Sequence, residues 1–100
     1  MIMNNFEQLI AGDKPVLVDF FATWCGPCKM MHPILEELKQ SIGDRATIIK
    51  IDVDEAQEFA VQYGVRAVPT LAIFKRGQLV WREAGVHSAQ QLIQALEPFV

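Results

Sequence analysis

Cysteine is scarce in this chain, which has only two among its 100 residues, Cys25 and Cys28. A disulfide between residues so close in sequence closes a loop too short to restrict the unfolded chain much, so it cannot be what holds the fold together. Chance seldom places the only two cysteines of a protein at the spacing of redox pairs. We therefore interpret the pair as two thiols that react, against the alternative of two ordinary half-buried cysteines.

A basic surface and a long apolar run are also lacking. Nine Lys and Arg against twelve Asp and Glu give a formal net charge of −3, so no binding surface for a nucleic acid backbone is expected. No stretch approaches the roughly 20 apolar residues that cross a bilayer. Residues 1–5 lack the charged start and apolar run of a secretory signal. We expect a cytoplasmic protein that binds neither nucleic acid nor membrane.

What the chain does have is the composition of one compact domain. Hydrophobic residues make up 51% and charged residues 21%, which suits a chain of this length with a single core. The sequence contains no repeats, low-complexity runs or linkers. We expect one domain over residues 1–100.

Hydrophobic spacing alternates between the periods of helices and strands. A helix is predicted behind Asn4 as its cap, and Gly12 marks its end. Residues 16–21 are apolar on both alternating faces, as in a central strand covered on both sides. The longest helix is predicted over residues 25–42, with a kink at Pro33 rather than a break.

The second half of the chain continues this alternation. Residues 47–53 have the pattern of a second buried strand. Asp54 is predicted to cap the helix that follows, and Gly64 is predicted to end it. Residues 70–74 and 79–82 are predicted to form an antiparallel hairpin, because their connection is short.

A capping-box pair, Ser88 and Gln91, predicts a last helix. The predicted order is αβαβαββα, which indicates an α/β fold. Its central sheet is expected to be mixed, with parallel pairing among the early strands, an antiparallel pair late in the chain and helices on both faces.

Cys25 is placed to be the attacking sulfur. It begins a predicted helix, where free N–H groups and the positive end of the helix dipole favour a thiolate. Paired-cysteine motifs typically lower the pKa of such a thiol below the free value of about 8.5. Cys28 lies one turn later, on the core-facing stripe with Met31 and Leu35. We expect Cys25 to attack from a position open to solvent, and the more shielded Cys28 to resolve the mixed disulfide.

Gly26 and Pro27 separate the two cysteines. Gly26 permits the chain to turn, and Pro27 fixes φ at an early helical position where its missing N–H is tolerated. A stiff turn that holds two sulfurs at bonding distance favours the disulfide after reaction and makes the dithiol reducing. We expect these two residues to tune the redox poise.

Asp19 is a carboxylate in the otherwise apolar run 16–21. Desolvation is expected to raise its pKa, and it is expected to point to the underside of the helix that carries Cys28. We interpret Asp19 as the base that accepts the Cys28 proton through a water molecule. The alternative is a structural carboxylate paired with Lys50 on the neighbouring strand. The two interpretations are compatible, because Lys50 can hold Asp19 partly ionised while Asp19 still moves a proton.

Pro69 stands directly before a predicted strand, where proline removes a ladder donor and is normally excluded. A cis Val68–Pro69 peptide would explain its tolerance.

The chain resembles the thioredoxin family. The matching residues span nearly the whole chain in the family's order and are Val18-Asp19-Phe20, Trp24-Cys25-Gly26-Pro27-Cys28-Lys29-Met30, Pro33, Lys50, Asp52-Val53-Asp54, Tyr63-Gly64-Val65-Arg66, Val68-Pro69-Thr70, Phe74, Gly77 and Gly85.

The resemblance implies a thioredoxin fold and a protein disulfide reductase with a redox-active Cys25–Cys28 disulfide. It implies that Val68–Pro69 is cis beside the sulfurs and that the Val68 backbone pairs with an extended segment of the substrate. The implied apolar docking surface comprises Trp24, Gly26, Pro27, Ala67, Pro69, Gly85 and Val86. The implied electron source is NADPH, through a flavin-containing thioredoxin reductase. The protein itself is expected to bind no cofactor or metal and to act as a monomer.

The chain departs from the family's pattern at two places. The family usually has a strand before its first helix, and here only residues 1–3 precede Asn4. We therefore expect that edge strand to be missing or vestigial, with four good strands and an exposed sheet edge. The family often has Trp where this chain has Phe21, which affects the packing around Asp19 but not the chemistry.

Three other functions are weighed against the reductase. A metal site would use Cys25, Cys28 and His32, but a closed zinc or iron–sulfur site wants four ligands, and the only other histidine, His87, is distant in sequence. An oxidase or isomerase is disfavoured by the reducing turn and the missing leader. The last is a docking module or subunit that uses no redox chemistry, and such a role would survive replacement of both cysteines by serine.

Overall fold

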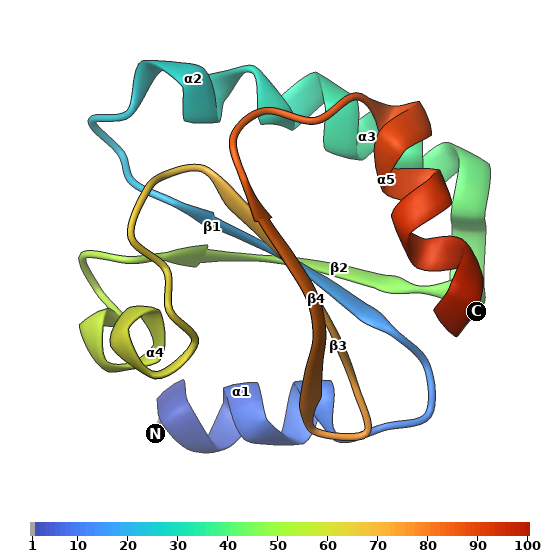
Figure 1. Ribbon diagram of the computed structural model, residues 1–100, viewed down its shortest axis with the longest axis horizontal. Helices are drawn as coiled ribbons and strands as arrows, with labels where there is room; N and C mark the ends of the chain where they lie inside the picture. The colour runs from blue at the N-terminus through green and yellow to red at the C-terminus, as the bar shows by residue number, and fades with distance from the viewer. Residues whose placement is uncertain (1) are drawn as a thin grey trace.

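A four-stranded mixed sheet forms the centre of the protein in a computed structural model that describes residues 2–100 (Figure 1). The strands are β1 (Val16–Phe21), β2 (Thr47–Asp52), β3 (Thr70–Lys75) and β4 (Gln78–Ala84), and their order across the sheet is β2-β1-β3-β4. β1 pairs with β2 in parallel and with β3 antiparallel, and β3 and β4 form an antiparallel hairpin. The predicted mixed sheet and its late hairpin are confirmed.

Helices cover both faces of the sheet (Figure 1). α1 (Ile2–Ile10) and α4 (Gln57–Gln62) lie on one side; α2 (Gly26–Lys29), α3 (Met31–Ile42) and α5 (Ala89–Leu96) lie on the other. Short 3₁₀ turns follow α3 and α5, at Gly43–Arg45 and Glu97–Phe99.

Two apolar clusters hold these layers together, and β1 contributes to both. Val16, Val18 and Phe20 pack toward α1 and α4, whereas Leu17 packs toward α3 and α5. Successive strand residues point to opposite faces, so a strand covered on both sides must be apolar at nearly every position. This accounts for the apolar run 16–21 and places Asp19 on the same face as Leu17.

The segment predicted as one kinked helix over residues 25–42 is divided into α2 and α3. Met30 lies between them and keeps helical angles, φ −67° and ψ −22°. Pro33 has no N–H to donate to the carbonyl of Lys29, four residues earlier, and this missing bond falls where the two helices meet. The assignment of one continuous helix is therefore wrong, and the kink at Pro33 stays a prediction.

Three other local predictions are also wrong. β2 is an edge strand, half-buried with Lys50 exposed, rather than a buried strand. Asp54 does not cap α4, whose N-cap is Ala56. Asn4 lies inside α1 rather than at its cap. The capping box at Ser88 and Gln91 is confirmed, with both of its hydrogen bonds present.

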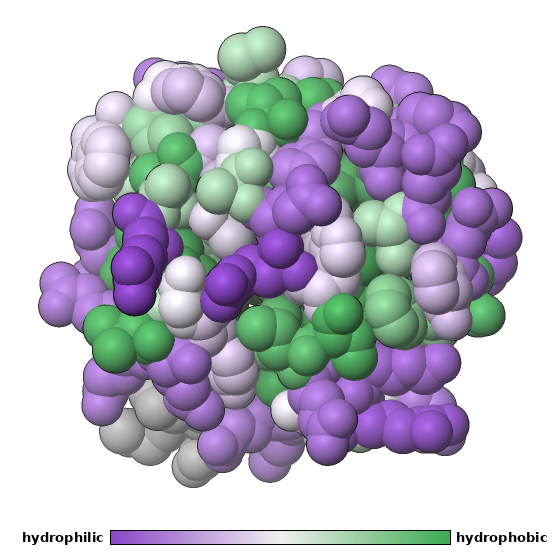
Figure 2. Space-filling view, viewed as in Figure 1, coloured by the Kyte–Doolittle hydropathy of each residue, from purple (hydrophilic) through white to green (hydrophobic). Residues whose placement is uncertain are grey.

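The sheet within residues 2–100 has four strands, the number that the sequence predicts. One side of β2 has no neighbouring strand in the described part of the chain. None of the helices in residues 2–100 is long and apolar enough to cross a membrane. The face seen in Figure 2 mixes hydrophilic and hydrophobic residues rather than carrying one apolar band.

Candidate active site

Cys25 and Cys28 are joined by a disulfide, with their Cα atoms 5.3 Å apart. Cys25 is the N-cap of α2, and the backbone N–H of Cys28 donates a hydrogen bond to the Cys25 Sγ over 3.1 Å. The predicted pairing and the predicted position of Cys25 at a helix N-terminus are both present. This N–H is one of the free donors in the first turn of α2, and it polarises the Cys25 sulfur by direct contact.

The two sulfurs do not differ in exposure as predicted. Cys25 and Cys28 are each only 4% exposed, because bonded sulfurs share one environment. They pack with Ala22 and are contacted by Phe21 and Val68. Cys28 does begin the buried stripe that continues along α3, but the expectation that Cys25 is open while Cys28 is shielded is wrong for this disulfide form.

The Val68–Pro69 peptide is cis, as expected. The Val68 carbonyl oxygen lies 3.6 Å from the Cys25 Sγ, so this loop sits directly beside the sulfurs. The Pro69 carbonyl accepts a hydrogen bond from the Gly85 N–H over 2.8 Å. The loop before β3 and the loop after β4 are therefore tied together next to Cys25.

Asp19 is fully buried in β1. Neither of its carboxylate oxygens has a hydrogen-bond partner within residues 2–100. Burial raises the pKa of Asp19 from 3.8 to about 6, and the positive charge of Lys50 opposes part of that rise. Phe21, two residues later, contacts the cysteine cluster, so the face of β1 that carries Asp19 leads to the sulfurs. The predicted direction of the pKa shift is confirmed.

Lys50 lies opposite Asp19 in the parallel register of β1 and β2, but the two side chains form no ion pair. The Lys50 Nζ is 2.6 Å from His32 Nδ1 and 5.1 Å from the centre of the Phe21 ring. Lys50 therefore acts on Asp19 through space and not by contact. The alternative of a structural Asp19–Lys50 pair is wrong in its direct form.

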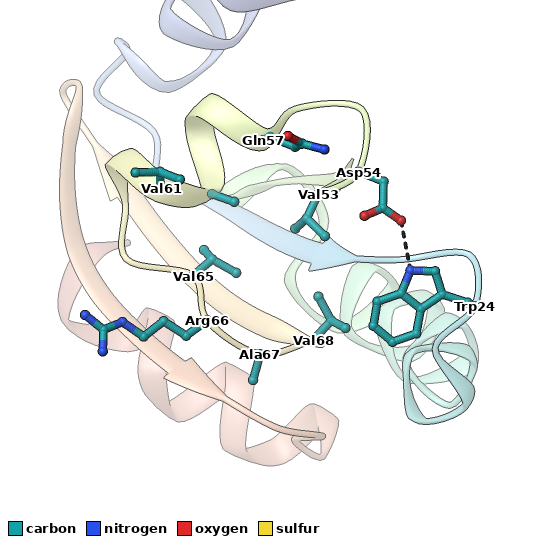
Figure 3. A pocket seen from close by; sticks show the side chains of 10 residues that line it. Trp24, Val53, Asp54, Gln57, Val61, Val65, Arg66, Ala67 and Val68 are labelled. Carbon is teal, nitrogen blue, oxygen red and sulfur yellow. Dashed lines mark hydrogen bonds between the residues drawn. The ribbon is translucent and has the colours of Figure 1, made fainter.

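A hollow of about 390 Å³ lies beside the disulfide (Figure 3). It brings together Trp24 and Ala67 of the expected docking surface with Val68, whose backbone is expected to pair with the substrate. Trp24 is 71% exposed. The remaining expected residues, Gly26, Pro27, Pro69, Gly85 and Val86, do not line this hollow. Its other walls come from the end of β2, α4 and the following loop, through Val53, Asp54, Gln57, Ala60, Val61, Val65 and Arg66.

Asp54 is the residue at this site that sequence reasoning placed wrongly. Its Oδ2 accepts a hydrogen bond from the Trp24 indole N–H over 2.9 Å (Figure 3). The bond joins residues thirty positions apart, so no local spacing could reveal it. No feature of the sequence indicated that Val61, an exposed valine, lines the hollow.

His32, the third candidate ligand of the metal alternative, is turned toward Lys50. Cys25 and Cys28 are bonded to each other. Within residues 2–100 no three side chains of the metal-binding types gather at one place.

A redox-spaced cysteine pair at the start of a helix, set against a cis-proline loop where the two central strands β1 and β3 end and begin, defines a thiol–disulfide oxidoreductase. Comparison with known proteins agrees with this class. The family model described as Thioredoxin matches residues 1–98, and the chain belongs to the thioredoxin family. It is accordingly a disulfide reductase that works by thiol–disulfide exchange.

Individual proteins show how close the similarity is. A thioredoxin-like protein of Synechocystis is 52% identical, over 96% of this chain and 92% of its own length. The chloroplastic thioredoxin Y of Oryza sativa is 45% identical, over 94% of this chain and 56% of its own length. Among solved structures, a mutant thioredoxin of Halobacterium salinarum superposes with a TM-score of 0.86 at 39% identity, covering 96% of this chain and 83% of that one.

Proposed function

We propose that this chain is a general protein disulfide reductase in which Cys25 is the nucleophile and Cys28 the resolving thiol. The Cys25 thiolate attacks one sulfur of a substrate disulfide and releases the other as a thiolate, leaving a mixed disulfide. Cys28 then attacks the Cys25 sulfur, forms the Cys25–Cys28 disulfide and releases the reduced substrate. Two electrons have passed from the dithiol to the substrate.

The observation that carries these roles is the hydrogen bond from the Cys28 N–H to the Cys25 Sγ. After reduction the same donor stabilises a negative charge on Cys25, because a charged acceptor strengthens a hydrogen bond. No matching donor to the Cys28 sulfur is present within residues 2–100. The Cys28 thiolate lacks this stabilisation, so Cys28 is assigned the second step, the attack on the Cys25 sulfur of the mixed disulfide.

Asp19 is proposed as the proton acceptor for Cys28. A base is most effective when its pKa lies near the working pH, and the pKa of Asp19 is raised to about 6 by burial. Lys50 tunes this value from a distance by favouring the ionised form. Protons of Cys28 would reach Asp19 through a water molecule.

Gly26 and Pro27 are proposed to set the redox poise. Pro27 occupies the first turn of α2, where its fixed φ prepares the chain for the helix. Less freedom is then lost when the two sulfurs come together, which favours the disulfide product and makes the dithiol reducing.

The proposed docking surface combines Trp24, Ala67, Val68, Pro69, Gly85 and Val86. The Val68 backbone, beside Cys25, would pair with an extended segment around the substrate disulfide.

We further propose that a flavin-containing thioredoxin reductase regenerates the dithiol with electrons from NADPH. The chain itself binds no cofactor in this proposal, and it works in the cytoplasm as a single domain and a monomer. One relative, thioredoxin Y of Oryza sativa, is named as chloroplastic. Cell fractionation is therefore the measurement that tests the proposed cytoplasmic location.

The test is the reduction of a disulfide-containing model protein, with dithiothreitol as electron source in one assay and NADPH with a thioredoxin reductase in another. We expect the wild-type chain to accelerate the reaction, and Cys25→Ser to abolish the acceleration. No acceleration over reductant alone would overturn the reductase. A docking role without redox chemistry would be favoured instead if a bound partner is retained by the variant with both cysteines replaced by serine.

A further inference from the structure

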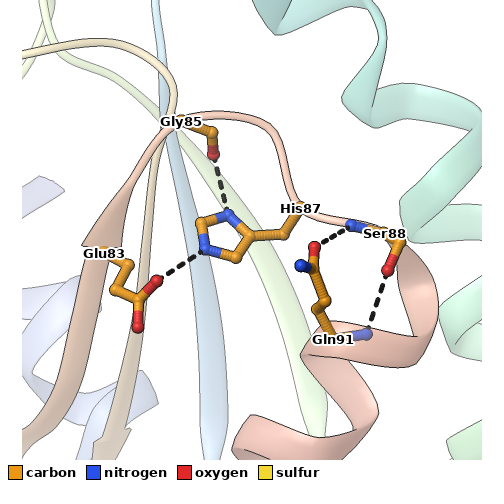
Figure 4. A network of polar contacts seen from close by, with 5 residues as sticks. All are labelled: Glu83, Gly85, His87, Ser88 and Gln91. Carbon is orange, nitrogen blue, oxygen red and sulfur yellow. Dashed lines mark hydrogen bonds and ion pairs between the residues drawn. The ribbon is translucent and has the colours of Figure 1, made fainter.

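His87 lies between β4 and α5, outside the set of residues that the sequence pointed to for the reaction. Its side chain is only 9% exposed. Ring Nδ1 is 2.8 Å from the Gly85 carbonyl oxygen, and ring Nε2 is 3.1 Å from Glu83 Oε1 (Figure 4). The Trp81 ring meets the imidazole edge to face, with 5.6 Å between ring centres. The imidazole is thus held on several sides.

Both partners of the ring nitrogens are acceptors. A backbone carbonyl and a carboxylate have no proton to offer, and a neutral imidazole has only one N–H. A neutral His87 would therefore leave one nitrogen lone pair facing an oxygen lone pair. Only an imidazolium donates both hydrogen bonds at once, so both contacts are satisfied together in that protonation state alone.

The charges around His87 are few. The hollow beside it, of about 310 Å³, is lined by Trp81, Glu83, His87, Gln91, Gln94 and Ala95. Glu83 is the one other titratable residue among them, and it comes from β4, while α5 contributes only neutral side chains. The neighbouring Arg82 is directed to the Tyr63 carbonyl instead. Glu83 is thus the one charged side chain that lines this hollow beside the ring.

Gly85 connects His87 to the reactive sulfur. Its φ of +98° is one that side chains rarely adopt, so the loop takes its sharp turn there. The Gly85 N–H donates to the Pro69 carbonyl over 2.8 Å, and the Val68 carbonyl lies 3.6 Å from the Cys25 Sγ. The carbonyl of the same glycine contacts the His87 Nδ1. Gly85 therefore joins the two loops beside the disulfide through its N–H, and its carbonyl is held by His87.

We propose that His87 is a positioning residue for substrate docking, which as an imidazolium clamps the Gly85–Val86 loop against the cis-proline loop. This inference rests on the proposed function, in which those two loops receive the substrate. Histidine exchanges a proton within the physiological pH range. As the pH rises and the ring loses a proton, the remaining N–H is kept by the Glu83 carboxylate, which is the stronger acceptor. The bond to the Gly85 carbonyl then breaks and the loop loosens. Docking of protein substrates therefore weakens toward alkaline pH, independently of the thiol chemistry.

Two variants separate the clamp from a structural role. His87→Leu removes both donors, and we expect the KM for a protein disulfide to rise about threefold to tenfold, the value of one or two net hydrogen bonds. The kcat, and the rate with a small disulfide that needs no docking loop, should change less than twofold. Glu83→Gln offers the ring an amide that both donates and accepts, so a neutral imidazole keeps its bond to Gly85. In that variant the ratio of the KM for the protein disulfide to the KM for the small disulfide should no longer change with pH between about pH 5 and 9, because the thiol chemistry affects both substrates alike.

Ser88→Ala is the matched control. It removes the side chain that caps α5 but leaves both ring contacts of His87, so KM and its pH dependence should stay those of wild type. The clamp is wrong if His87→Leu leaves KM unchanged, or if it slows protein and small disulfides equally. It is also wrong if Glu83→Gln retains the wild-type pH dependence of that KM ratio.

A spectroscopic measurement tests the clamp without turnover. In ¹⁵N NMR spectra of the wild-type protein we expect both His87 ring nitrogens to carry protons at the acid end of that pH range. On deprotonation of the ring, the Gly85 amide signal should shift. A ring with one proton throughout, or a Gly85 amide that does not respond, overturns the clamp. Failure of the wild-type chain to reduce a protein disulfide overturns the proposed function instead, so the two failures are distinguishable.

Discussion

Asp19 is an ionisable residue in a buried, apolar place. It is fully buried, without a hydrogen-bond partner in the described chain, in a strand that is otherwise apolar. An unpaired buried carboxyl costs stability, so its presence on the face that leads to the sulfurs supports a role in the reaction rather than in the fold. Two of the following predictions depend on it, one in kinetics and one in stability.

Asp19→Asn should slow the resolution of the mixed disulfide. The pKa of Asp19 is about 6, so its carboxylate fraction, and with it the wild-type resolution rate, should rise with pH through that value. The variant should lose this rise and be slower by about 10²-fold, the lower end of general base catalysis. Stopped-flow tryptophan fluorescence on a preformed mixed disulfide measures the rate. Asp44→Asn, which changes an exposed carboxylate, is the control; a rise through pH 6 that persists in Asp19→Asn would contradict the prediction.

Cys28→Ser should accumulate mixed disulfides with substrate proteins at Cys25. Without the second sulfur, the first step has no intramolecular exit, and the adduct persists until an external thiol releases it. Non-reducing electrophoresis and mass spectrometry of the adducts identify both the linked cysteine and the substrates. Cys25→Ser is the matched variant and should trap none. Adducts that form equally on Cys25→Ser would show that the roles of the two sulfurs are reversed.

At the scale of elements, the site is made where secondary structures end. β1 leads into Cys25, α2 begins at it, the cis-proline loop enters β3, and the turn after β4 leads into α5. Backbone N–H and carbonyl groups at such ends have no partner within their own helix or strand. They are therefore free to contact the Cys25 sulfur and to bond one loop to the other. β2, an edge strand within residues 2–100, supplies Lys50, which lies against His32 of α3.

Ser88→Ala should lower the free energy of unfolding by about 1 kcal/mol, the usual value of an N-cap side chain. The Ser88 hydroxyl accepts from the Gln91 N–H, and the Gln91 side chain accepts from the Ser88 N–H. α5 packs its buried face on α3 and the sheet, so fraying of its first turn is felt by the core. Urea unfolding followed by circular dichroism measures the change. Ser41→Ala, at an exposed position within α3, should cost nothing; equal losses in the two variants would contradict the role of the cap.

At the scale of the whole molecule, the sheet separates two apolar clusters, and the charged group buried between layers makes stability depend on pH. The pKa of Asp19 is raised in the folded state, so the folded protein binds this proton more tightly than the unfolded chain does. The contribution of the protonated group is complete below about pH 3.8 and is lost as the pH rises through about 6. Ionisation of this one side chain therefore destabilises the fold at neutral and alkaline pH.

Asp19→Asn should consequently be more stable than wild type above neutrality, by up to about 3 kcal/mol. The difference should shrink toward zero as the pH falls to about 4, because wild-type Asp19 is then neutral as well. Denaturant unfolding of the disulfide form at a series of pH values gives both free energies. Equal stabilities of the two proteins at alkaline pH would contradict the buried, unpaired state of Asp19.

The sequence by itself determined the order of the elements, the redox pair and the buried carboxylate. These depend on local information: hydrophobic period reports which faces are covered, and short spacing reports which side chains meet within one turn. The same reasoning misplaced the cap of α4 and the continuity of residues 25–42, because helix ends depend on single hydrogen bonds that periodicity does not record.

Only the tertiary structure decided the contacts between distant segments. The Trp24–Asp54 bond, the turn of Lys50 toward His32 and the attachment of His87 to Gly85 and Glu83 all depend on how strands and loops are brought side by side. The equal burial of the two sulfurs likewise follows from the loops that pack around them. Such contacts have no period along the chain, because packing joins residues according to their distance in space and not in sequence.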